Sequence, residues 1–316
     1  MQDSSFEVRQ LVGRLRFRHL QLLVALRESG SLHSAALELN LTQPALSKAL
    51  AEVEAAFACP LFSRSSRGVA PTERGELAIQ GATQLLNELA HLGSEVSSTQ
   101  AAMVLRIGAP PFVSRGYLPE VLQRLLTQRG PPVRVQLEEE RVPLLVQLLL
   151  QGRVDALITS YPAETASAEM AALQFEKLFD AAFVVVAPAR HRLCRSRRVT
   201  WQQLAEESWV LPSERSMVRR NINAMFQRAG ARLPTALIES TNPLTNVRLV
   251  AQGLGLAAVP LDQARNALSS GEVERIRVYP PIPDSPVALV YRIQSNNPRV
   301  ALLRHSLGLA TASNEV

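Results

Sequence analysis

Hydrophobic residues recur at helical spacing over the first part of the chain and predict three helices. The first covers residues 18–28 and ends at Gly30, a residue type that readily adopts the positive φ of a helix end. The second covers residues 32–39. The third begins after Thr42 and has Pro44 in its first turn, where a missing N–H costs nothing. Its apolar positions step by four, three and four residues and predict one buried face, formed by Leu46, Leu50, Val53 and Phe57.

Two short helices joined by a tight turn are typical of a helix-turn-helix unit, which lays the start of its second helix in the major groove of DNA. The side chains at that start suit the task. Gln43 can form paired hydrogen bonds with an adenine edge, and Lys48 can reach guanine or a phosphate. The residues expected to contact DNA from this helix are Thr42, Gln43, Pro44, Ala45, Ser47 and Lys48. A capped helix of this kind also occurs in many proteins that bind no DNA.

Residues 61–72 read as two short extended pieces around a polar turn that ends at Gly68. This pattern predicts a β-wing that carries Arg64 and Arg67, well placed for a DNA backbone or minor-groove contact. The alternative is that these two arginines only meet water.

A long helix is predicted from residue 73 to about residue 99, capped by Thr72. Its apolar positions alternate steps of four and three, as in a coiled-coil seam, at Ala78, Ala82, Leu85, Leu89, Leu92 and Val96. This spacing favours pairing with a second copy of the chain. A helix that packs on its own domain would also show an apolar stripe, so that alternative stays open.

Strand-like and helix-like runs alternate through the C-terminal two-thirds, which predicts α/β sheets with parallel strands in two small subdomains that the chain crosses between twice. Strands are expected at residues 104–108, 133–137, 156–159, 182–187, 209–211, 236–238, 256–259, 273–278 and 287–292. Helices are expected at residues 117–128, 143–150, 218–229, 245–252 and 300–309.

The ordered motifs of residues 17–75 resemble the winged helix of LysR-type transcriptional regulators. The matching elements are Gly30-Ser31, Ala35-Ala36, Leu39, the run from Thr42 to Ser47, Glu54, Leu61-Phe62, Arg64, Pro71-Thr72 and Gly75. The resemblance implies DNA contacts at Gln43, Pro44, Ser47 and Lys48, with phosphate contacts from Ser31, His33 and Arg64. Two positions depart from the family pattern. Ser34 replaces a frequent arginine, which puts one phosphate contact in doubt, and Ala58-Cys59 stands where a glycine is usual, which alters a turn.

The runs LRIGA (105–109), GRVDALIT (152–159) and LVAQGLGLAAVP (249–260) resemble the effector domain of the same family, which has the fold of type 2 periplasmic binding proteins. The expected fold class is therefore α+β and multi-domain. An all-α winged helix-turn-helix domain (1–75) precedes a linker and dimerisation helix (76–100) and an α/β effector-binding domain (101–316). The last consists of two Rossmann-like subdomains, subdomain I at about 101–178 plus 262–316 and subdomain II at about 179–261.

Domains of this kind bind a ligand in the cleft between their subdomains, at strand ends and helix N-termini. By position, the effector-binding residues are expected to be Pro110, Pro111, Phe112, Ser114, Thr159, Ser160, Ser213, Ser216, Arg219, Thr241 and Asn242. Several are Ser, Thr or Asn just before helices and could donate to an anion together with backbone N–H groups. Each of them could instead be a simple helix cap.

Composition narrows the function further. The net charge of +6 suggests a polyanionic partner, but residues 1–90 hold nine basic and nine acidic residues, so the excess lies in the C-terminal part.

The two cysteines, Cys59 and Cys194, lie far apart and predict neither a disulfide nor a metal site. The alternative is a low-pKa thiol at Cys194, among Arg195, Arg197 and Arg198. We find no catalytic motif, and we expect no cofactor and no metal. A polar N-terminus and the lack of a long apolar run predict a cytoplasmic chain with no membrane partner.

The expected function is that of a non-enzymatic regulator, which binds an interrupted palindrome in double-stranded DNA as a dimer or tetramer and responds to a small-molecule effector. The excess of arginines favours an organic anion as effector, and RNA polymerase is a further candidate partner. Two alternatives are an enzyme or transport-type binding protein fused to a DNA-binding segment, and an architectural DNA-binding protein without a ligand.

Overall fold

The computed structural model describes residues 11–65, 68–97, 102–127, 132–160, 170–214, 216–293 and 297–309. The chain divides into two compact units. One unit comprises Met1–Leu105, Pro131–Arg134 and Gln147–Asp155, and the other comprises Arg106–Gly130, Val135–Val146 and Ala156–Val316. Within the described residues, every helix is too short or too polar to cross a lipid bilayer.

The N-terminal helices form where the hydrophobic spacing predicts them. Helices α2 (Phe17–Ser29), α3 (Leu32–Glu38) and α4 (Gln43–Phe57) surround one apolar core. Leu23, Leu26 and Leu46 are fully excluded from solvent in this core. Gly30 ends α2 in the left-handed conformation, as the sequence predicts.

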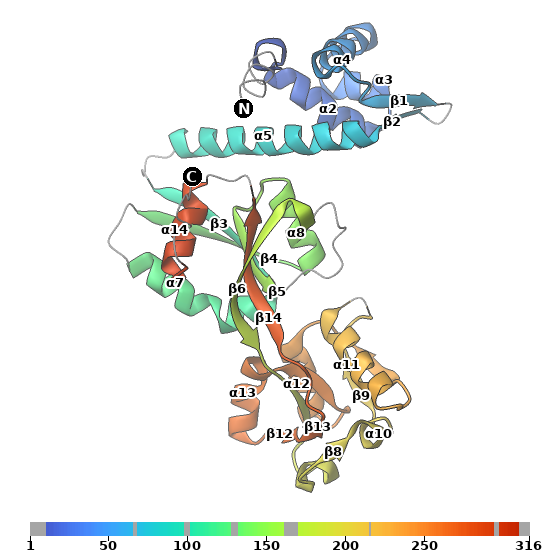
Figure 1. The fold of residues 1–316 in the computed structure, drawn as a ribbon, viewed down its shortest axis with the longest axis vertical. Helices are drawn as coiled ribbons and strands as arrows, with labels where there is room; N and C mark the ends of the chain where they lie inside the picture. Colours follow the sequence, from blue (N-terminus) through green and yellow to red (C-terminus); the bar gives the residue numbers. More distant parts are fainter. Residues whose placement is uncertain are drawn as a thin grey trace. The chain divides into compact units, whose positions relative to one another are not determined.

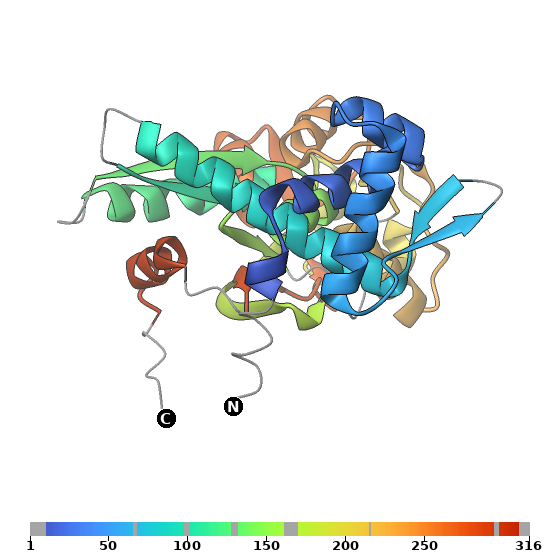
Figure 2. The same cartoon turned by 90° about the horizontal axis from the view of Figure 1, so that it is seen from above.

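A two-stranded antiparallel hairpin, β1 (Phe62–Ser65) and β2 (Gly68–Pro71), follows α4 and projects from these helices (Figures 1 and 2). The hairpin joins the helical core through the N–H of Val69, which donates to the carbonyl of Gly30 at 2.9 Å. Gly68 has a φ of 121°, and a Cβ there would lie 2.7 Å from that same carbonyl oxygen. The predicted wing is therefore present as a hairpin, although its tip at residues 66–67 lies outside the described residues.

The long helix α5 covers Glu73–Ser97 and spans roughly 40 Å. Thr72 caps it by accepting a hydrogen bond from the N–H of Gly75 at 3.0 Å. The apolar stripe has two roles. Ile79 and Ala82 are buried in the core of α2–α4, whereas the last four seam positions are exposed: Leu85, Leu89, Leu92 and Val96. The expectation of one continuous pairing seam is therefore wrong at Ala82, and at the half-buried Ala78, because the first turns of α5 complete the core of their own domain.

Subdomain I is built on a five-stranded sheet of order β4-β3-β5-β14-β6. Its strands are β3 (Met103–Ala109), β4 (Val133–Glu139), β5 (Ala156–Ser160), β6 (Leu173–Ala181) and β14 (Ser285–Arg292). Its helices are α6 (Pro111–Gly116), α7 (Leu118–Thr127), α8 (Val142–Leu150) and α14 (Pro298–Ser306). Strands β6 and β14 are the two connections to subdomain II, and they pair side by side from Leu173↔Arg292 to Ala181↔Ser285 (Figure 1).

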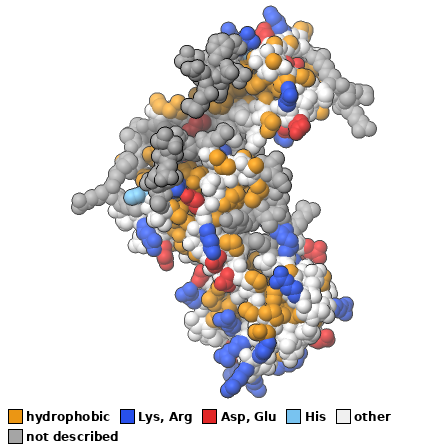
Figure 3. All heavy atoms as spheres, in the orientation of Figure 1, with side chains coloured by type: hydrophobic (Ala, Val, Ile, Leu, Met, Phe, Trp, Pro, Cys, Tyr) orange, Lys and Arg blue, Asp and Glu red, His pale blue; other side chains and the backbone are white. Residues whose placement is uncertain are grey.

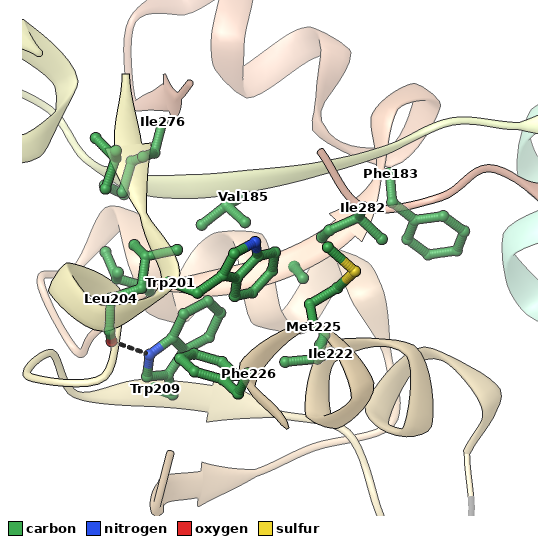
Figure 4. Packing of buried hydrophobic residues seen from close by; sticks show 14 of the residues in the cluster. Phe183, Val185, Trp201, Leu204, Trp209, Ile222, Met225, Phe226, Ile276 and Ile282 are labelled. Carbon is green, nitrogen blue, oxygen red and sulfur yellow. Dashed lines mark hydrogen bonds between the residues drawn. The ribbon is translucent and has the colours of Figure 1, made fainter. Parts of the chain in front are cut away.

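Subdomain II contains three small sheets, of order β11-β7-β12, β10-β9 and β13-β8. Its strands are β7 (Phe183–Pro188), β8 (Val199–Thr200), β9 (Trp209–Leu211), β10 (Ala236–Glu239), β11 (Ala257–Pro260), β12 (Val273–Ile276) and β13 (Val278–Tyr279). Its helices are η1 (Arg192–Arg195), α10 (Trp201–Leu204), α11 (Met217–Arg228), α12 (Pro243–Ala251) and α13 (Leu261–Ser270). The ring of Phe226 meets both Trp201 and Trp209 edge-on, and the Trp209 indole N–H donates to the Leu204 carbonyl at 2.9 Å (Figure 4).

Two expectations for the C-terminal domain need correction. The five-stranded sheet is mixed, since β14 runs antiparallel to β5 and β6 while β3 runs parallel to β5, and the β11-β7-β12 sheet is antiparallel. The β10-β9 and β13-β8 pairs are parallel, as predicted. The return to subdomain I also comes later than residue 262. Helix α13 and strand β12 complete the core around β7, and the chain returns only at β14, so subdomain II ends near Ile282.

Candidate nucleic-acid interface and effector site

The leading turn of α4 is held at the protein surface by the burial of its opposite face. Leu46, Leu50 and Val53 are buried, and they fix how the helix rotates about its axis. The residues on the other side are exposed, apart from the half-buried Ser47: Thr42, Gln43, Pro44, Ala45, Ser47 and Lys48. Thr42 caps the helix by accepting a hydrogen bond from the Ala45 N–H at 3.3 Å. The structure thus brings the six predicted residues of this helix together on one accessible surface.

Four further DNA contacts are predicted outside α4, at the start of α3 and on the hairpin. Ser31 caps α3 by accepting from the Ser34 N–H at 3.4 Å, so its hydroxyl already has a structural role. His33 is exposed in the first turn of α3. Arg64 lies on β1 opposite Val69, whereas Arg67 lies outside the described residues.

Glu54 holds the wing against α4, a role that the sequence pattern alone did not assign. Its carboxylate accepts hydrogen bonds from the N–H groups of Leu61 at 2.7 Å and Phe62 at 3.1 Å. Since both donors lie at the start of β1, this one side chain fixes where the hairpin leaves the helical core. Hydrogen bonds to a carboxylate are stronger than those between neutral groups, which strengthens this pair of contacts.

Ala58 explains the departure from the family pattern at the end of α4. It adopts a left-handed conformation, with φ of 52° and ψ of 30°, and ends the helix. A glycine adopts this conformation without steric cost, and an alanine does so at a cost of roughly 1 kcal/mol. The substitution therefore strains the turn and leaves the fold unchanged.

The predicted effector residues of subdomain I follow β3 and β5. Pro110 and Pro111 begin α6, and the carbonyl of Phe112 accepts from the Gln263 side chain of α13 at 3.2 Å. Ser114 is buried and donates to backbone carbonyls of its own turn. Thr159 and Ser160 end β5 and are buried.

The predicted effector residues of subdomain II lie mainly at helix starts. Ser216 caps α11, and the side chain of Asn242 caps α12 by accepting from the N–H groups of Leu244 and Thr245. Ser213 accepts from the Ser216 N–H through its carbonyl, and Thr241 is exposed. Arg219 is buried, and its Nε donates to Asn223 at 3.1 Å. Capping therefore accounts for Ser216 and Asn242 without any ligand.

Two buried side-chain oxygens have no hydrogen-bond partner within the described part of the chain. These are Oγ1 of Thr159, which is fully excluded from solvent, and Oδ1 of Asn246, whose amide nitrogen donates to the Ser240 carbonyl. A buried polar atom without a partner costs about 1–3 kcal/mol, so such atoms often serve a ligand. Asn246 was missed from the sequence because it lies on the inner face of α12, one turn beyond the cap.

The environment of Cys194 contradicts the idea of a reactive thiol. Burial, together with the charge and hydrogen bonding of Glu274, raises the pKa of the Cys194 thiol to about 11. The thiol is therefore protonated at neutral pH, despite the arginines that surround it in the sequence. Only a thiolate is an effective nucleophile, so this cysteine is poorly suited to redox sensing. Within the described residues no group of three or more potential ligands could hold a metal ion.

Comparison with known proteins identifies the class of protein that this architecture defines. The family described as "Bacterial regulatory helix-turn-helix protein, lysR family" matches residues 17–76, and the family described as "LysR substrate binding domain" matches residues 98–310. The chain therefore belongs to the LysR family of bacterial regulators. It is a DNA-binding transcriptional regulator with a C-terminal domain for a small-molecule effector.

Individual relatives agree with this assignment. The chain is 30% identical to the HTH-type transcriptional regulator GbpR of Azospirillum brasilense over 77% of its own length and 70% of that protein. It is 31% identical to the HTH-type transcriptional regulator GalR of Pseudomonas putida, over 82% of its own length and 64% of that protein. Among solved structures it is similar to a full-length OxyR variant from Pseudomonas aeruginosa, with a TM-score of 0.60 and 25% identity, over 94% of this chain and 96% of that one.

Proposed function

We propose that this regulator reads an interrupted palindrome through two copies of α4, one from each chain of a dimer. The observation that supports this most strongly is the exposure of Gln43, Pro44 and Lys48 on a helix whose other face is fully buried. A glutamine and a lysine at this point of a helix can contact base edges, while Ser31, His33, Arg64 and Arg67 contact phosphates.

The exposed end of α5 supplies the dimer contact in this proposal. Leu85, Leu89, Leu92 and Val96 are between 41% and 77% exposed, which is unusual for four large apolar side chains on one helix. Pairing with a second α5 would bury them and hold the two α4 helices about one turn of DNA apart. We propose that two such dimers associate into a tetramer on DNA.

We propose an organic anion as the effector, bound between the two subdomains. The candidate residues combine hydroxyl groups, amides and one buried guanidinium: Ser114, Thr159, Ser160, Ser213, Ser216, Arg219, Thr241, Asn242 and the residues 110–112. The partnerless Oγ1 of Thr159 supports a polar ligand on the subdomain I side. Binding would close the subdomains by a change at the paired strands β6 and β14, shift the population of assemblies and thereby change DNA spacing.

Cytoplasmic location, a contact with RNA polymerase and the absence of catalytic activity complete the proposal. They rest on the regulator class of the relatives.

The DNA-binding part is tested by fluorescence anisotropy with a promoter duplex to which the full chain binds. Replacing Arg64 with Ala should weaken binding to all sequences and lower the slope of log K against log salt by about one, because one phosphate contact is lost. Arg124→Ala is the matched control, since Arg124 is exposed on α7 and its ion pair with Glu120 is 3.9 Å long. An unchanged salt slope for Arg64→Ala would contradict a contact between the wing and DNA.

The effector part is tested by a thermal-shift screen of small carboxylates on the full chain, followed by DNA footprinting. A ligand should raise the melting temperature, as any ligand of the native state does, and it should change the protected region. A ligand that stabilises the protein and never alters the footprint would contradict the proposed switch.

A further inference from the structure

A concave site lies in subdomain II, and none of the proposed effector residues lines it. It has a volume of about 570 Å³ and is lined by Cys194, Glu274, Arg275 and Arg277. These residues come from η1, from strand β12 and from the connection to β13. The volume falls within the range of roughly 300–1,000 Å³ that is typical of small-molecule sites.

Arginines crowd this part of the subdomain. Arg192, Arg195, Arg197 and Arg198 follow one another on η1 and the segment after it, and all four are exposed, as are Arg275 and Arg277. The segments lie together because the N–H of Val199 donates to the carbonyl of Arg277, and Val199 pairs with Val278 in the β8–β13 ladder. Figure 3 shows Lys and Arg side chains gathered at the end of the subdomain where β8 lies.

Among the described residues, only one of these six guanidinium groups has an acidic partner. Arg192 is bound to Glu207, and Arg198 stacks on the ring of Tyr279 at 3.3 Å. The side chains of the other four form no hydrogen bond or ion pair within the described part of the chain: Arg195, Arg197, Arg275 and Arg277.

The acidic residue in the concavity does not neutralise this charge. Glu274 already accepts a hydrogen bond from the backbone N–H of Arg190 at 2.8 Å and is hydrogen-bonded to the Cys194 thiol. Its single negative charge faces two lining arginines and two more beside them. A net positive concavity therefore remains, and an anion bound there would offset the repulsion between its like charges.

We propose that this concavity binds a small anion that carries two or more phosphate groups. Guanidinium groups match phosphate oxygens in bidentate geometry, and several unpaired arginines call for several negative charges on the ligand. A small molecule suits the site better than a duplex backbone, because Arg275 and Arg277 line a hollow rather than a ridge. The protonated Cys194 thiol forms part of the wall and takes no covalent role.

The test measures binding of sodium tripolyphosphate to the full chain by isothermal titration calorimetry at constant ionic strength, with sodium sulfate as the comparison anion. The parent should bind tripolyphosphate at least tenfold more tightly than sulfate. The double variant Arg275→Ser/Arg277→Ser should bind it at least tenfold more weakly. Its melting temperature without ligand should match the parent, which shows that it folds.

The matched control is Arg228→Ser/Arg232→Ser, which removes the same charge from exposed positions of the same subdomain outside the concavity. This control should retain the parent affinity. An equal loss of tripolyphosphate affinity in both double variants would overturn the proposal, because it would show that the anion is attracted by the overall positive charge of the subdomain and not by this concavity. Failure of the parent to bind tripolyphosphate at millimolar concentration would also overturn it. Weaker DNA binding by Arg275→Ser/Arg277→Ser without any tripolyphosphate binding would assign the arginines to the duplex backbone instead.

Discussion

At the scale of single residues, Glu54 shows how one half-buried side chain positions the hairpin beside α4. Its carboxylate connects the middle of α4 to the first two N–H groups of the hairpin. Gly75 has a related role, since a Cβ at this position would lie 1.9 Å from the carbonyl oxygen of Leu61. Both residues belong to the family motif that the sequence shows. The structural role of each is seen only where the hairpin packs against α4 and α5.

Replacing Glu54 with Ala should lower the free energy of unfolding by about 2–3 kcal/mol, because two backbone donors lose a charged acceptor. Chemical denaturation of the full chain measures this loss. Glu52→Ala is the control, because Glu52 is half-exposed on the same helix and lies 3.8 Å from Nε2 of His19. Equal stability of the two variants would show that the Glu54 contacts contribute nothing.

The raised pKa of Cys194 predicts a pH dependence in both reactivity and stability. In a Cys59→Ser background, iodoacetamide should modify Cys194 far more slowly than free cysteine at pH 7.5. The rate should rise as the pH approaches about 11. A modification rate at pH 7.5 equal to that of free cysteine would contradict the buried, protonated thiol.

The sign of the stability change follows from linkage. The pKa of the Cys194 thiol in the folded chain lies above the ordinary value of a cysteine, about 9.0, so the unfolded chain loses the thiol proton first. The stabilising contribution is complete below pH 9 and is lost as the pH rises towards about 11. A Cys194→Ser variant in the same background should therefore show a weaker fall in stability across this range.

At the scale of elements, the helices and strands that follow from hydrophobic periodicity could be predicted from the sequence. Elements whose form depends on tertiary contacts could not. Helices α2 to α5 and most strands lie within a few residues of their predicted ranges. Strand β6 was not predicted, because a bulge opposite Val287 and Ala288 breaks its alternation. Helix α13 was also missed, since its start at Leu261 directly after β11 leaves no separating turn in the sequence.

The same limit applies to the sites. The six α4 residues could be predicted because their exposure follows from the buried face of one helix. The effector residues depend on how two subdomains meet, so sequence spacing identified helix caps such as Ser216 and Asn242 but not the buried Asn246. The role of Ile79 in the winged-helix core was missed for the same reason, because it lies off the heptad positions of α5.

Replacing Leu89 and Leu92 with Gln should shift the chain from dimer to monomer. The two leucines are 41% and 54% exposed on α5, so the change leaves the fold of one chain intact and removes apolar area from the proposed interface. Analytical ultracentrifugation should show at least a tenfold weaker self-association. Leu77→Gln is the control, because Leu77 is 67% exposed on the same helix and outside the seam. Self-association that survives the double change would place the dimer contact elsewhere.

At the scale of the whole molecule, the chain combines three independent surfaces. In our proposal, the α4 surface reads DNA, the end of α5 sets the distance to a second copy, and the C-terminal domain carries the small-molecule sites. The basic excess fits this division, because it lies in residues 91–316 and not in the neutral DNA-binding segment. This distribution supports the proposal that recognition of DNA depends on a few placed side chains and not on bulk charge.

Selection of binding sites from a randomised duplex library tests that central claim most directly. The parent and a Gln123→Ala control, which changes an exposed glutamine of α7, should select the same interrupted palindrome with half-sites about one helical turn apart. Gln43→Ala should lose preference at one position in each half-site, at a cost of about 1–3 kcal/mol against the preferred base. Selection of an unaltered motif by Gln43→Ala, or of a single undivided site by the parent, would contradict the account.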